Sequence, residues 1–332
     1  MKALLYHQYG APDVVKMAEV EKPIAKDNEV LIRIHATTIT TADWRARSLK
    51  LPDGFGILGR LVFGILKPRK PILGSELAGV IEATGKDVTK FKVGDAVVAF
   101  TGADFGCHAE YRTIPEQGLI VKKPANLSFE RAAALSFGGT TALDFLRNKG
   151  GIRAGDKVLI VGASGGVGSA AVQLAKHFGA IVTAVCSTAN LQTMHLIGAT
   201  KTIDYTKEDF TKNGETYDII LDVTGTVSYA RCENSLKPAG RLLLVLASFG
   251  QTLGFDRSPK GSDKKVITGV AAERTSDLKF LAQLAETEEF TPVIDQIYPF
   301  DKAVEAHARV DTGHKKGNVI ISLVSDQLEE ST

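Results

Sequence analysis

Hydrophobic and polar positions follow two different rhythms along the chain. From Met1 to about Lys123, apolar residues alternate with polar ones in short runs such as EVLIRIHA (29–36) and DAVVAF (95–100), which Gly, Pro and Asp interrupt. A period of two between turn residues is typical of antiparallel strands. The pattern therefore predicts a β-rich unit in the first part of the chain.

After residue 123 the rhythm changes to a strand followed by a helix, several times over. Continuous apolar runs such as KVLIV (157–161) and YDIILDV (217–223) are separated by helically spaced segments such as GSAAVQLAKHF (168–178). This alternation predicts an α/β fold with a doubly wound parallel sheet. The segments from Pro292 onward do not extend the series, and we expect them to return to the first unit.

Residues 55–70, FGILGRLVFGILKPRK, contain apolar side chains at helical spacing followed by a basic tail. The helix is too short to span a membrane. A segment of this kind covers an apolar core or pocket more often than it lies on a membrane surface. We interpret it as a lid.

Composition narrows the classes of function. The 332 residues include 40 basic and 38 acidic side chains, a net charge of +2, which gives no electrostatic reason to expect a nucleic-acid or membrane-surface partner. The three cysteines, Cys107, Cys186 and Cys232, are too few and too widely spaced for a disulfide framework or a four-thiolate zinc site. With no signal-peptide pattern and no run of eighteen apolar residues, we expect a cytoplasmic protein with reduced thiols.

A glycine-rich turn follows the apolar strand at 158–161. The sequence GASGGVG (162–168) leads into an amphipathic helix, and backbone N–H groups at such a helix start bind phosphate without a basic side chain. In the G-x-G-x-x-G dinucleotide fingerprint the first glycine is here Ala163, while Gly165 and Gly168 are kept. No Lys-Ser/Thr pair follows, so the turn predicts a dinucleotide rather than a nucleoside triphosphate.

The end of the next strand decides which dinucleotide fits. There the sequence reads VCSTANLQ (185–192), with no Asp or Glu to bind the adenosine ribose of NAD. This favours NADP(H) over NAD(H), although no Arg or Lys stands at the same turn. The alternative interpretation is a polar loop without a role in binding.

Several motifs in this order resemble the medium-chain dehydrogenase/reductase (MDR) superfamily, and within it the zinc-independent quinone oxidoreductase-like branch: ILGSELAGVIEATG (72–85), FKVGDAVVAF (91–100), AAALSFGGTTAL (132–143), GASGGVGSAAVQLAK (162–176) and DVTG (222–225). The resemblance implies a GroES-like catalytic domain made of residues 1–123 and 292–332. It also implies a Rossmann NAD(P)-binding domain at 124–291 and a homodimer in which KVITGVA (265–271) pairs edge to edge.

Zinc-dependent relatives carry Gly-His-Glu where this chain has Gly74, Ser75 and Glu76. Serine is a poor zinc ligand, so the resemblance implies no metal. Without a Lewis acid, hydride addition to a quinone or an α,β-unsaturated carbonyl is favoured, because its oxyanion is delocalised. The alternatives are an NADP-dependent alcohol or aldehyde reductase and a non-catalytic NADPH-binding regulatory protein.

The resemblance also assigns site residues. The catalytic candidates are Thr40, Asp43 and Thr141, and the substrate-pocket candidates are Trp44 and Phe100. The cofactor-binding candidates are Ala163, Ser164, Gly165, Gly166, Val167, Gly168, Ser187, Thr188, Tyr205, Thr224, Gly225, Ala247, Ser248 and Phe249. Structural roles compete at several of these positions: Asp43, Glu76 and Glu110 as fold-stabilising carboxylates, Thr141 as a helix cap and Tyr205 as a packed aromatic.

Overall fold

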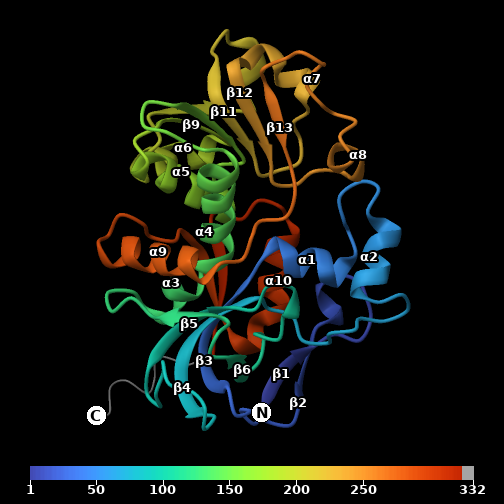
Figure 1. The fold of residues 1–332 in the computed structure, drawn as a ribbon. Coiled ribbons are helices and arrows are strands. Elements are labelled where there is room, and N and C mark those ends of the chain that lie inside the picture. Colours follow the sequence, from blue (N-terminus) through green and yellow to red (C-terminus); the bar gives the residue numbers. More distant parts are fainter. Residues whose placement is uncertain (324–332) are drawn as a thin grey trace. The chain divides into compact units, whose positions relative to one another are not determined.

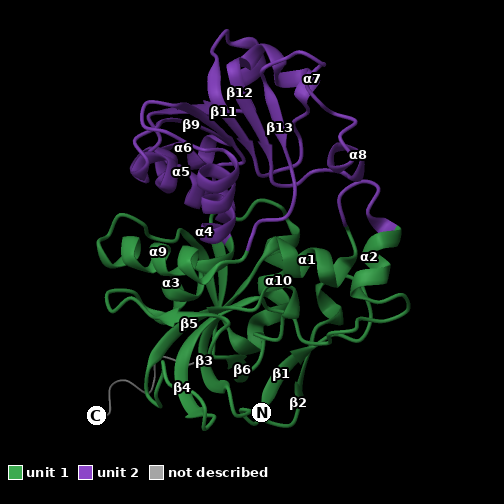
Figure 2. Ribbon diagram, viewed as in Figure 1, with its two compact units in different colours: residues 1–50, 57–137, 273–332 green, residues 51–56, 138–272 purple. Residues whose placement is uncertain are grey.

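The computed structural model describes residues 1–323 (Figure 1). The described residues form two compact units, one made of residues 1–50, 57–137 and 273–323, the other of residues 51–56 and 138–272 (Figure 2). We call them unit 1 and unit 2. Within the described range, none of the helices combines the length and apolar character that crossing a bilayer requires.

Unit 2 is built on a six-stranded sheet whose strands are all parallel, in the order β10-β9-β8-β11-β12-β13. The strands are β8 (Lys157–Val161), β9 (Ile181–Cys186), β10 (Lys201–Asp204), β11 (Tyr217–Asp222), β12 (Leu236–Leu244) and β13 (Lys265–Ile267). The chain moves outward from β8 to β10 and then returns to continue on the other side at β11. This reversal confirms the doubly wound fold and creates a switch point between β8 and β11, where such sheets bind ligands.

The helices of unit 2 follow the strands, as predicted. They are α4 (Ser136–Leu143, which begins in unit 1), α5 (Gly166–His177), α6 (Leu191–Leu196), α7 (Tyr229–Cys232) and α8 (Phe249–Thr252), with short turns η4 (Thr188–Asn190), η5 (Phe210–Lys212) and η6 (Glu233–Ser235). Helix α4 continues as a π-helical turn, η3 (Asp144–Lys149). Helix α5 packs on β8 and β9, and its Ala171, Leu174 and Ala175 are fully buried. Apolar burial of this kind holds the glycine turn in place.

Unit 1 contains a seven-stranded sheet in the order β14-β15-β3-β4-β5-β7, with β6 paired to β3. Its strands are β3 (Glu29–Ile39), β4 (Glu76–Thr84), β5 (Ala96–Phe100), β6 (Tyr111–Pro115), β7 (Leu119–Lys122), β14 (Ile294–Pro299) and β15 (Asn318–Ser322), and β1 (Lys2–Leu5) pairs with β2 (Lys16–Glu19) in a second, two-stranded sheet. Strand β15 lies antiparallel beside β3, with Val319 opposite Ile39. The segment after Pro292 therefore joins the N-terminal sheet.

The packing of the helices of unit 1 determines where the boundaries between the two units fall. They are α1 (Thr41–Ser48), α2 (Gly56–Phe63), α3 (Phe129–Ala133), α9 (Thr275–Glu286) and α10 (Ala303–Asp311), with η1 (Pro12–Val14), η2 (Gly102–Asp104) and η7 (Phe300–Lys302). Helix α3 packs on β3 and β4, and α9 packs on β7. Both helices therefore belong to unit 1, and the boundaries set by packing fall at 137/138 and 272/273 rather than at 123/124 and 291/292.

Candidate dinucleotide and substrate-side sites

Two glycines in the turn after β8 are required by packing. Gly162 has φ +79°, and a Cβ there would lie 2.3 Å from Cγ2 of Thr224; a Cβ on Gly168 would lie 2.2 Å from the carbonyl oxygen of Gly162. Ala163 is fully buried, and its N–H donates to the carbonyl oxygen of Val185 at 3.1 Å. The tight turn is therefore made by Gly162, one residue before the position that the G-x-G-x-x-G pattern assigns to it.

Gly165 is a different kind of glycine. It is the N-cap of α5 and has an extended backbone (φ −78°, ψ 177°). Apart from its chain neighbours, the only described atom within 4 Å of a Cβ at this position would be the Gly162 carbonyl oxygen, at 3.7 Å. The protein's own packing leaves this space open. The first-turn N–H groups of α5, from Gly166 to Gly168, have no partner within the helix and bear the positive end of its dipole. A dinucleotide pyrophosphate fits this cradle, with Ser164 and Val167 half-buried beside it.

The loop after β11 is shaped by a buried carboxylate that the sequence analysis did not single out. Asp222 accepts hydrogen bonds from the Thr224 N–H (2.8 Å), the Thr224 hydroxyl (2.6 Å) and the Val227 N–H (3.0 Å). Gly225 follows with φ +76°. Thr224 and Gly225 are exposed at the carboxyl end of the strand. In the sequence, the sign of this role was an Asp at the end of an apolar strand, shortly before Thr-Gly, because Asp in that position often accepts hydrogen bonds from a turn.

The loop after β12 begins helix α8. The Ser248 hydroxyl accepts from the Gln251 N–H at 3.2 Å, and the Gln251 side chain accepts from the Ser248 N–H at 2.9 Å, which completes a capping box. Ala247 is half-buried against the core of unit 2. Phe249 is 40% exposed and meets Phe55 edge to face at 5.4 Å. Of these three residues, the most accessible is the aromatic side chain.

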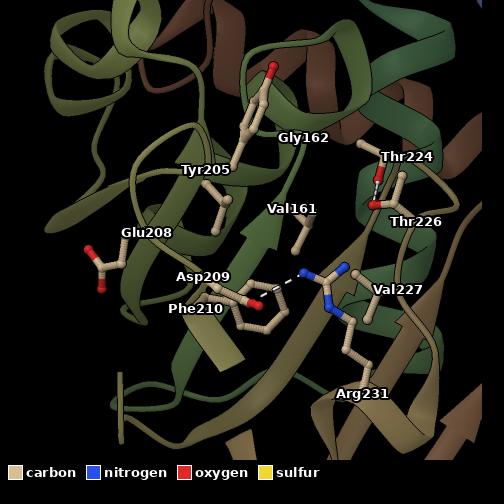
Figure 3. A pocket seen from close by; sticks show the side chains of 11 residues that line it. Val161, Gly162, Tyr205, Glu208, Asp209, Phe210, Thr224, Thr226, Val227 and Arg231 are labelled. Carbon is tan, nitrogen blue, oxygen red and sulfur yellow. Dashed lines mark hydrogen bonds and ion pairs between the residues drawn. The ribbon is translucent and has the colours of Figure 1, made fainter. Parts of the chain in front are cut away.

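A pocket of 520 Å³ lies at the carboxyl ends of β8, β9 and β11 within unit 2 (Figure 3). Its apolar wall includes Val185, Phe210 and Val227, and its rim includes Tyr205 and Arg231. The Arg231 guanidinium lies 3.3 Å from a carboxylate oxygen of Asp209. Tyr205 is 57% exposed, so the interpretation of this side chain as a packed aromatic is wrong. The pocket occupies the switch point at which the fold predicts a dinucleotide.

The end of β9 lies beside a carboxylate that the sequence did not predict there. The residues after β9 contain no carboxylate, but Asp204, at the end of β10, stands in register with Cys186 and accepts a hydrogen bond from the Thr188 hydroxyl. It also accepts from the N–H and hydroxyl of Thr206, at 3.0 and 2.7 Å. The hydroxyls of Thr188 and Thr206 lower the pKa of Asp204 to about 2, so a negative charge is present where none was expected. Ser187 lies nearby, its hydroxyl accepting from Asn190 Nδ2 at 3.0 Å.

In unit 1, Thr40 and Asp43 form a capping box at the start of α1. The Thr40 N–H and hydroxyl donate to Asp43 Oδ2 at 2.7 and 2.6 Å, and the Asp43 N–H donates back to the Thr40 hydroxyl at 3.3 Å. Asp43 Oδ1 accepts from the Gly74 N–H at 2.7 Å. Both side chains are buried, so they fix helix α1 against the Gly74–Glu76 segment rather than standing free to transfer protons.

Glu76, the first residue of β4, is fully buried. One oxygen accepts from the Thr38 hydroxyl and the other from the Phe137 N–H at 2.7 Å. Burial raises the pKa of this carboxyl to about 7, against the opposing effect of hydrogen bonds from the Phe137 N–H and the hydroxyls of Thr38 and Ser136. The side chain is therefore a structural anchor between β3, β4 and the start of α4. The sequence identified Glu76 only as part of the Gly74–Glu76 motif. It did not predict that Glu76 is buried with hydrogen-bond partners at the start of a strand.

The remaining candidates lie as follows. Thr141 is half-buried inside α4 and not at its start, which removes the helix-cap interpretation. Trp44 is half-buried against the core of unit 1, and Phe100, at the end of β5, is 8% exposed with its ring 6.4 Å from that of Phe137. The buried Ser75 hydroxyl has no hydrogen-bond partner among residues 1–323. Glu110 is a structural carboxylate that accepts from the Lys2 N–H at 2.7 Å.

Cys107 and His108 are accounted for by packing. The Cys107 sulfur lies 3.4 Å from the Thr101 hydroxyl, and His108 Nε2 lies 2.9 Å from the Thr38 carbonyl oxygen. Within the described part of the chain, no three His, Cys, Asp or Glu side chains gather as a metal site would require.

Comparison with known proteins agrees with this architecture. A model of the alcohol dehydrogenase GroES-like domain matches residues 26–125, and a model described as zinc-binding dehydrogenase matches residues 197–321, a span that excludes Ser75. The chain is 34% identical to 2-methylene-furan-3-one reductase of Solanum lycopersicum over 97% of this chain and 79% of the relative. It is 30% identical to the chloroplastic NADPH-dependent alkenal/one oxidoreductase of Arabidopsis thaliana, with the same coverage of both chains.

The solved structure of the quinone oxidoreductase from Coxiella burnetii superposes with a TM-score of 0.86 at 29% identity, covering 98% of this chain and 99% of that one. A GroES-like unit together with a doubly wound unit that carries a glycine turn defines a nicotinamide-dependent oxidoreductase. More narrowly, as its motifs indicated, the chain belongs to the quinone oxidoreductase-like branch of the MDR superfamily.

Proposed function

We propose that this protein transfers hydride from NADPH to a quinone or to the carbon–carbon double bond of an α,β-unsaturated carbonyl compound, without zinc. The observation that carries the proposal is the open space beside Gly165 at the start of α5, where we propose that the pyrophosphate lies. The substrate class is supported by the names of the relatives: an enone-type reductase, an alkenal/one oxidoreductase and a quinone oxidoreductase.

When bound, reduced nicotinamide supplies the hydride. The work of the chain is to hold and orient it. Gly165 and the first turn of α5 bind the pyrophosphate, the Asp222-shaped loop presents Thr224 and Gly225, and the Ala247–Phe249 loop presents Phe249. Thr141 is proposed to contact the nicotinamide ribose, as the resemblance implies. Tight positioning of this kind replaces a random encounter with an oriented one.

We propose that the candidate residues of unit 1 shape the substrate site and do not themselves take part in the reaction. Thr40 and Asp43 hold the Gly74–Glu76 segment through the Asp43–Gly74 hydrogen bond, and Trp44 and Phe100 supply apolar surface. Serine at position 75 removes the histidine that zinc-dependent relatives use. The oxyanion formed from a quinone or enone is delocalised, so hydrogen-bond donors suffice to stabilise it until water supplies the proton that completes the reduction.

The proposed preference for NADPH rests on the hydroxyl of Tyr205, which lines the pocket, on the hydroxyls of Ser187 and Thr188 after β9, and on the NADPH-dependent relative. The negative charge of Asp204 acts against it, but Lys207 Nζ lies 3.6 Å from that carboxylate and Arg231 lines the same pocket. We also propose a cytoplasmic homodimer that pairs through β13, the end strand of the parallel sheet.

The test is NADPH and NADH oxidation by the purified protein with a panel of 1,4-quinones, enones and saturated aldehydes, with and without EDTA. We expect turnover with quinones or enones, little with saturated aldehydes, a preference for NADPH and no effect of chelation. Turnover restricted to saturated aldehydes, or loss of activity with EDTA, would contradict the proposed reaction. Binding of NADPH without turnover on any electrophile would instead support the regulatory alternative.

A matched pair of variants tests the coenzyme cradle. Gly165→Ala places a methyl group where the pyrophosphate is proposed to lie, and we expect it to weaken NADPH binding at least about tenfold while leaving the fold intact. Gly56→Ala is the control, because that position also has open space for a Cβ and lies outside the turn. Equal NADPH affinity of the two variants would show that the cradle is not the pyrophosphate site.

A further inference from the structure

Helix α2 presents its apolar side chains to solvent. Six neighbouring aliphatic residues are exposed, and we call them the apolar patch: Ile57 (82%), Leu58 (46%), Leu61 (51%), Val62 (57%), Ile65 (56%) and Leu66 (92%). An ordinary surface helix buries such a face. The predicted helix is present, but the apolar patch is not packed on a core of the described residues, and the lid interpretation stays a prediction.

Contacts of the opposite face of α2 explain why its apolar side chains face the solvent. The inner face of α2 consists of Gly59, which is buried, and Phe63, whose ring lies 6.5 Å from that of Phe105 in the core of unit 1. The Tyr9 hydroxyl donates to the Gly64 carbonyl oxygen at 2.7 Å, and the Arg69 N–H donates to the Phe63 carbonyl oxygen at 2.9 Å. These contacts anchor the carboxyl end of α2 to the rest of unit 1. The apolar patch is consequently displayed by a fixed scaffold.

The charges beside the apolar patch have one sign. From Phe55 to Lys70 the sequence contains four basic residues and no acidic one. Arg60, Lys67 and Arg69 are exposed, and Lys70 is paired with Asp104. Because the whole protein carries a net charge of only +2, this excess is local to the segment. A short apolar face flanked by Arg and Lys is the chemistry of a helix that lies in the interface of an anionic membrane.

We propose that the apolar patch and its basic flank form a docking surface for an anionic lipid bilayer, with α2 lying in the headgroup region. A second copy of the chain is a poorer occupant, because a twofold interface would bring the same basic side chains face to face. The attachment is peripheral and reversible, since the patch is too short to span the hydrocarbon core. This inference goes beyond the proposed reaction and does not depend on it.

The experiment is co-sedimentation of the full-length protein with vesicles of phosphatidylcholine alone and with vesicles that also contain phosphatidylglycerol. We expect binding to the anionic vesicles, weak binding to the neutral ones, and release in high salt. The double variant Leu61→Ser, Ile65→Ser is expected to bind at least about tenfold less. Its fold is checked by thermal unfolding, and both side chains are exposed, so the fold is expected to persist.

Ile24→Ser is the matched control, because Ile24 is 85% exposed and lies outside the apolar patch; it is expected to bind like the unchanged protein. A charge variant, Lys67→Glu, is expected to weaken binding to anionic vesicles only. Failure of the unchanged protein to sediment with anionic vesicles overturns the proposal, as does equal binding by the double variant. If the unchanged protein is a dimer and the double variant is a monomer in light scattering, the apolar patch binds a second copy of the chain and the proposal is overturned. If the double variant changes KM for a water-soluble quinone in buffer without vesicles, the segment is a lid and the proposal is likewise overturned.

Discussion

The Cα of Gly168 faces the carbonyl oxygen of Gly162 so closely that a methyl group on Gly168 would lie 2.2 Å from that oxygen. The contact joins the first turn of α5 to the end of β8. The atom in the way is backbone, which cannot rotate aside as a side chain would. This distance therefore sets how near the helix lies to the sheet.

We predict that Gly168→Ala lowers the free energy of unfolding by about 2 kcal/mol or more, because the helix must shift to admit the methyl group. Urea unfolding measures the loss. Gly165→Ala, with its Cβ 3.7 Å from the nearest atom, is expected to change stability by less than about 0.5 kcal/mol. Similar losses in the two variants would mean that the turn differs from the one described.

Glu76 predicts a pH dependence of stability. Burial raises the pKa of its carboxyl from the ordinary 4.5 to about 7 in the folded chain. The folded state thus retains a proton that the unfolded state has lost, so the stabilisation is complete below the unfolded pKa and disappears as pH rises through the folded pKa. Between about pH 4.5 and 7, this residue is expected to lower the free energy of unfolding by up to about 3 kcal/mol.

The measurement is urea unfolding of the unchanged protein and of Glu76→Gln at several pH values in that range. The amide resembles the protonated carboxyl, so the variant is expected to lose most of the decline. A decline of equal size in both proteins would assign it to other groups.

Asp204 predicts a change in coenzyme preference. Asp204→Asn removes the negative charge beside Thr188, and we expect the ratio of kcat/KM for NADPH to that for NADH to rise roughly two- to fivefold, as for a weak charge interaction of about 0.4–1 kcal/mol. Asp218→Asn is the control, because Asp218 lies near the start of β11, at the opposite end of the strand from the pocket, and pairs with Lys237. An unchanged or lowered ratio in Asp204→Asn would place the adenosine phosphate elsewhere.

The three thiols are expected to be unreactive in the folded protein. Cys107, Cys186 and Cys232 are buried, and burial raises their pKa values to about 12, 11 and 12. The reactive thiolate is therefore scarce at neutral pH. A disulfide-exchange reagent should titrate three thiols in denaturant and almost none in native buffer; rapid native labelling of one of them would show that the structure opens at that site.

The sequence predicted the parts of the fold that local patterns determine. The parallel strands and the glycine turn are each formed by consecutive residues, so a doubly wound sheet with a phosphate-binding turn was predicted, whereas the strand order in the sheet was not. The charge at the end of β9 was missed because its carboxylate, Asp204, comes from the neighbouring strand and reaches Thr188 only through strand register. The role of Asp222 was missed for the opposite reason: its partners are close in sequence, but their hydroxyl and N–H donors converge only when the loop is folded.

Helix α2 shows a different limit. Its apolar spacing predicted a helix correctly but not which face turns inward, because that choice depends on contacts of Phe63 and Gly64 with Phe105 and Tyr9, which are distant in sequence. The spacing of apolar residues predicts that a helix has an apolar face. It does not predict whether that face packs on the protein or is exposed to solvent.

Strand β15 has a consequence for synthesis on the ribosome. It lies between β14 and β3, so the sheet of unit 1 stays incomplete until residues 318–322 have emerged, whereas the strands of the parallel sheet are all contained in residues 157–267. Translation thus delivers a finished nucleotide-binding half while β3 still has an unpaired edge. A nascent chain halted before residue 318 would expose that edge to other chains, and molecular chaperones would be needed to shield it.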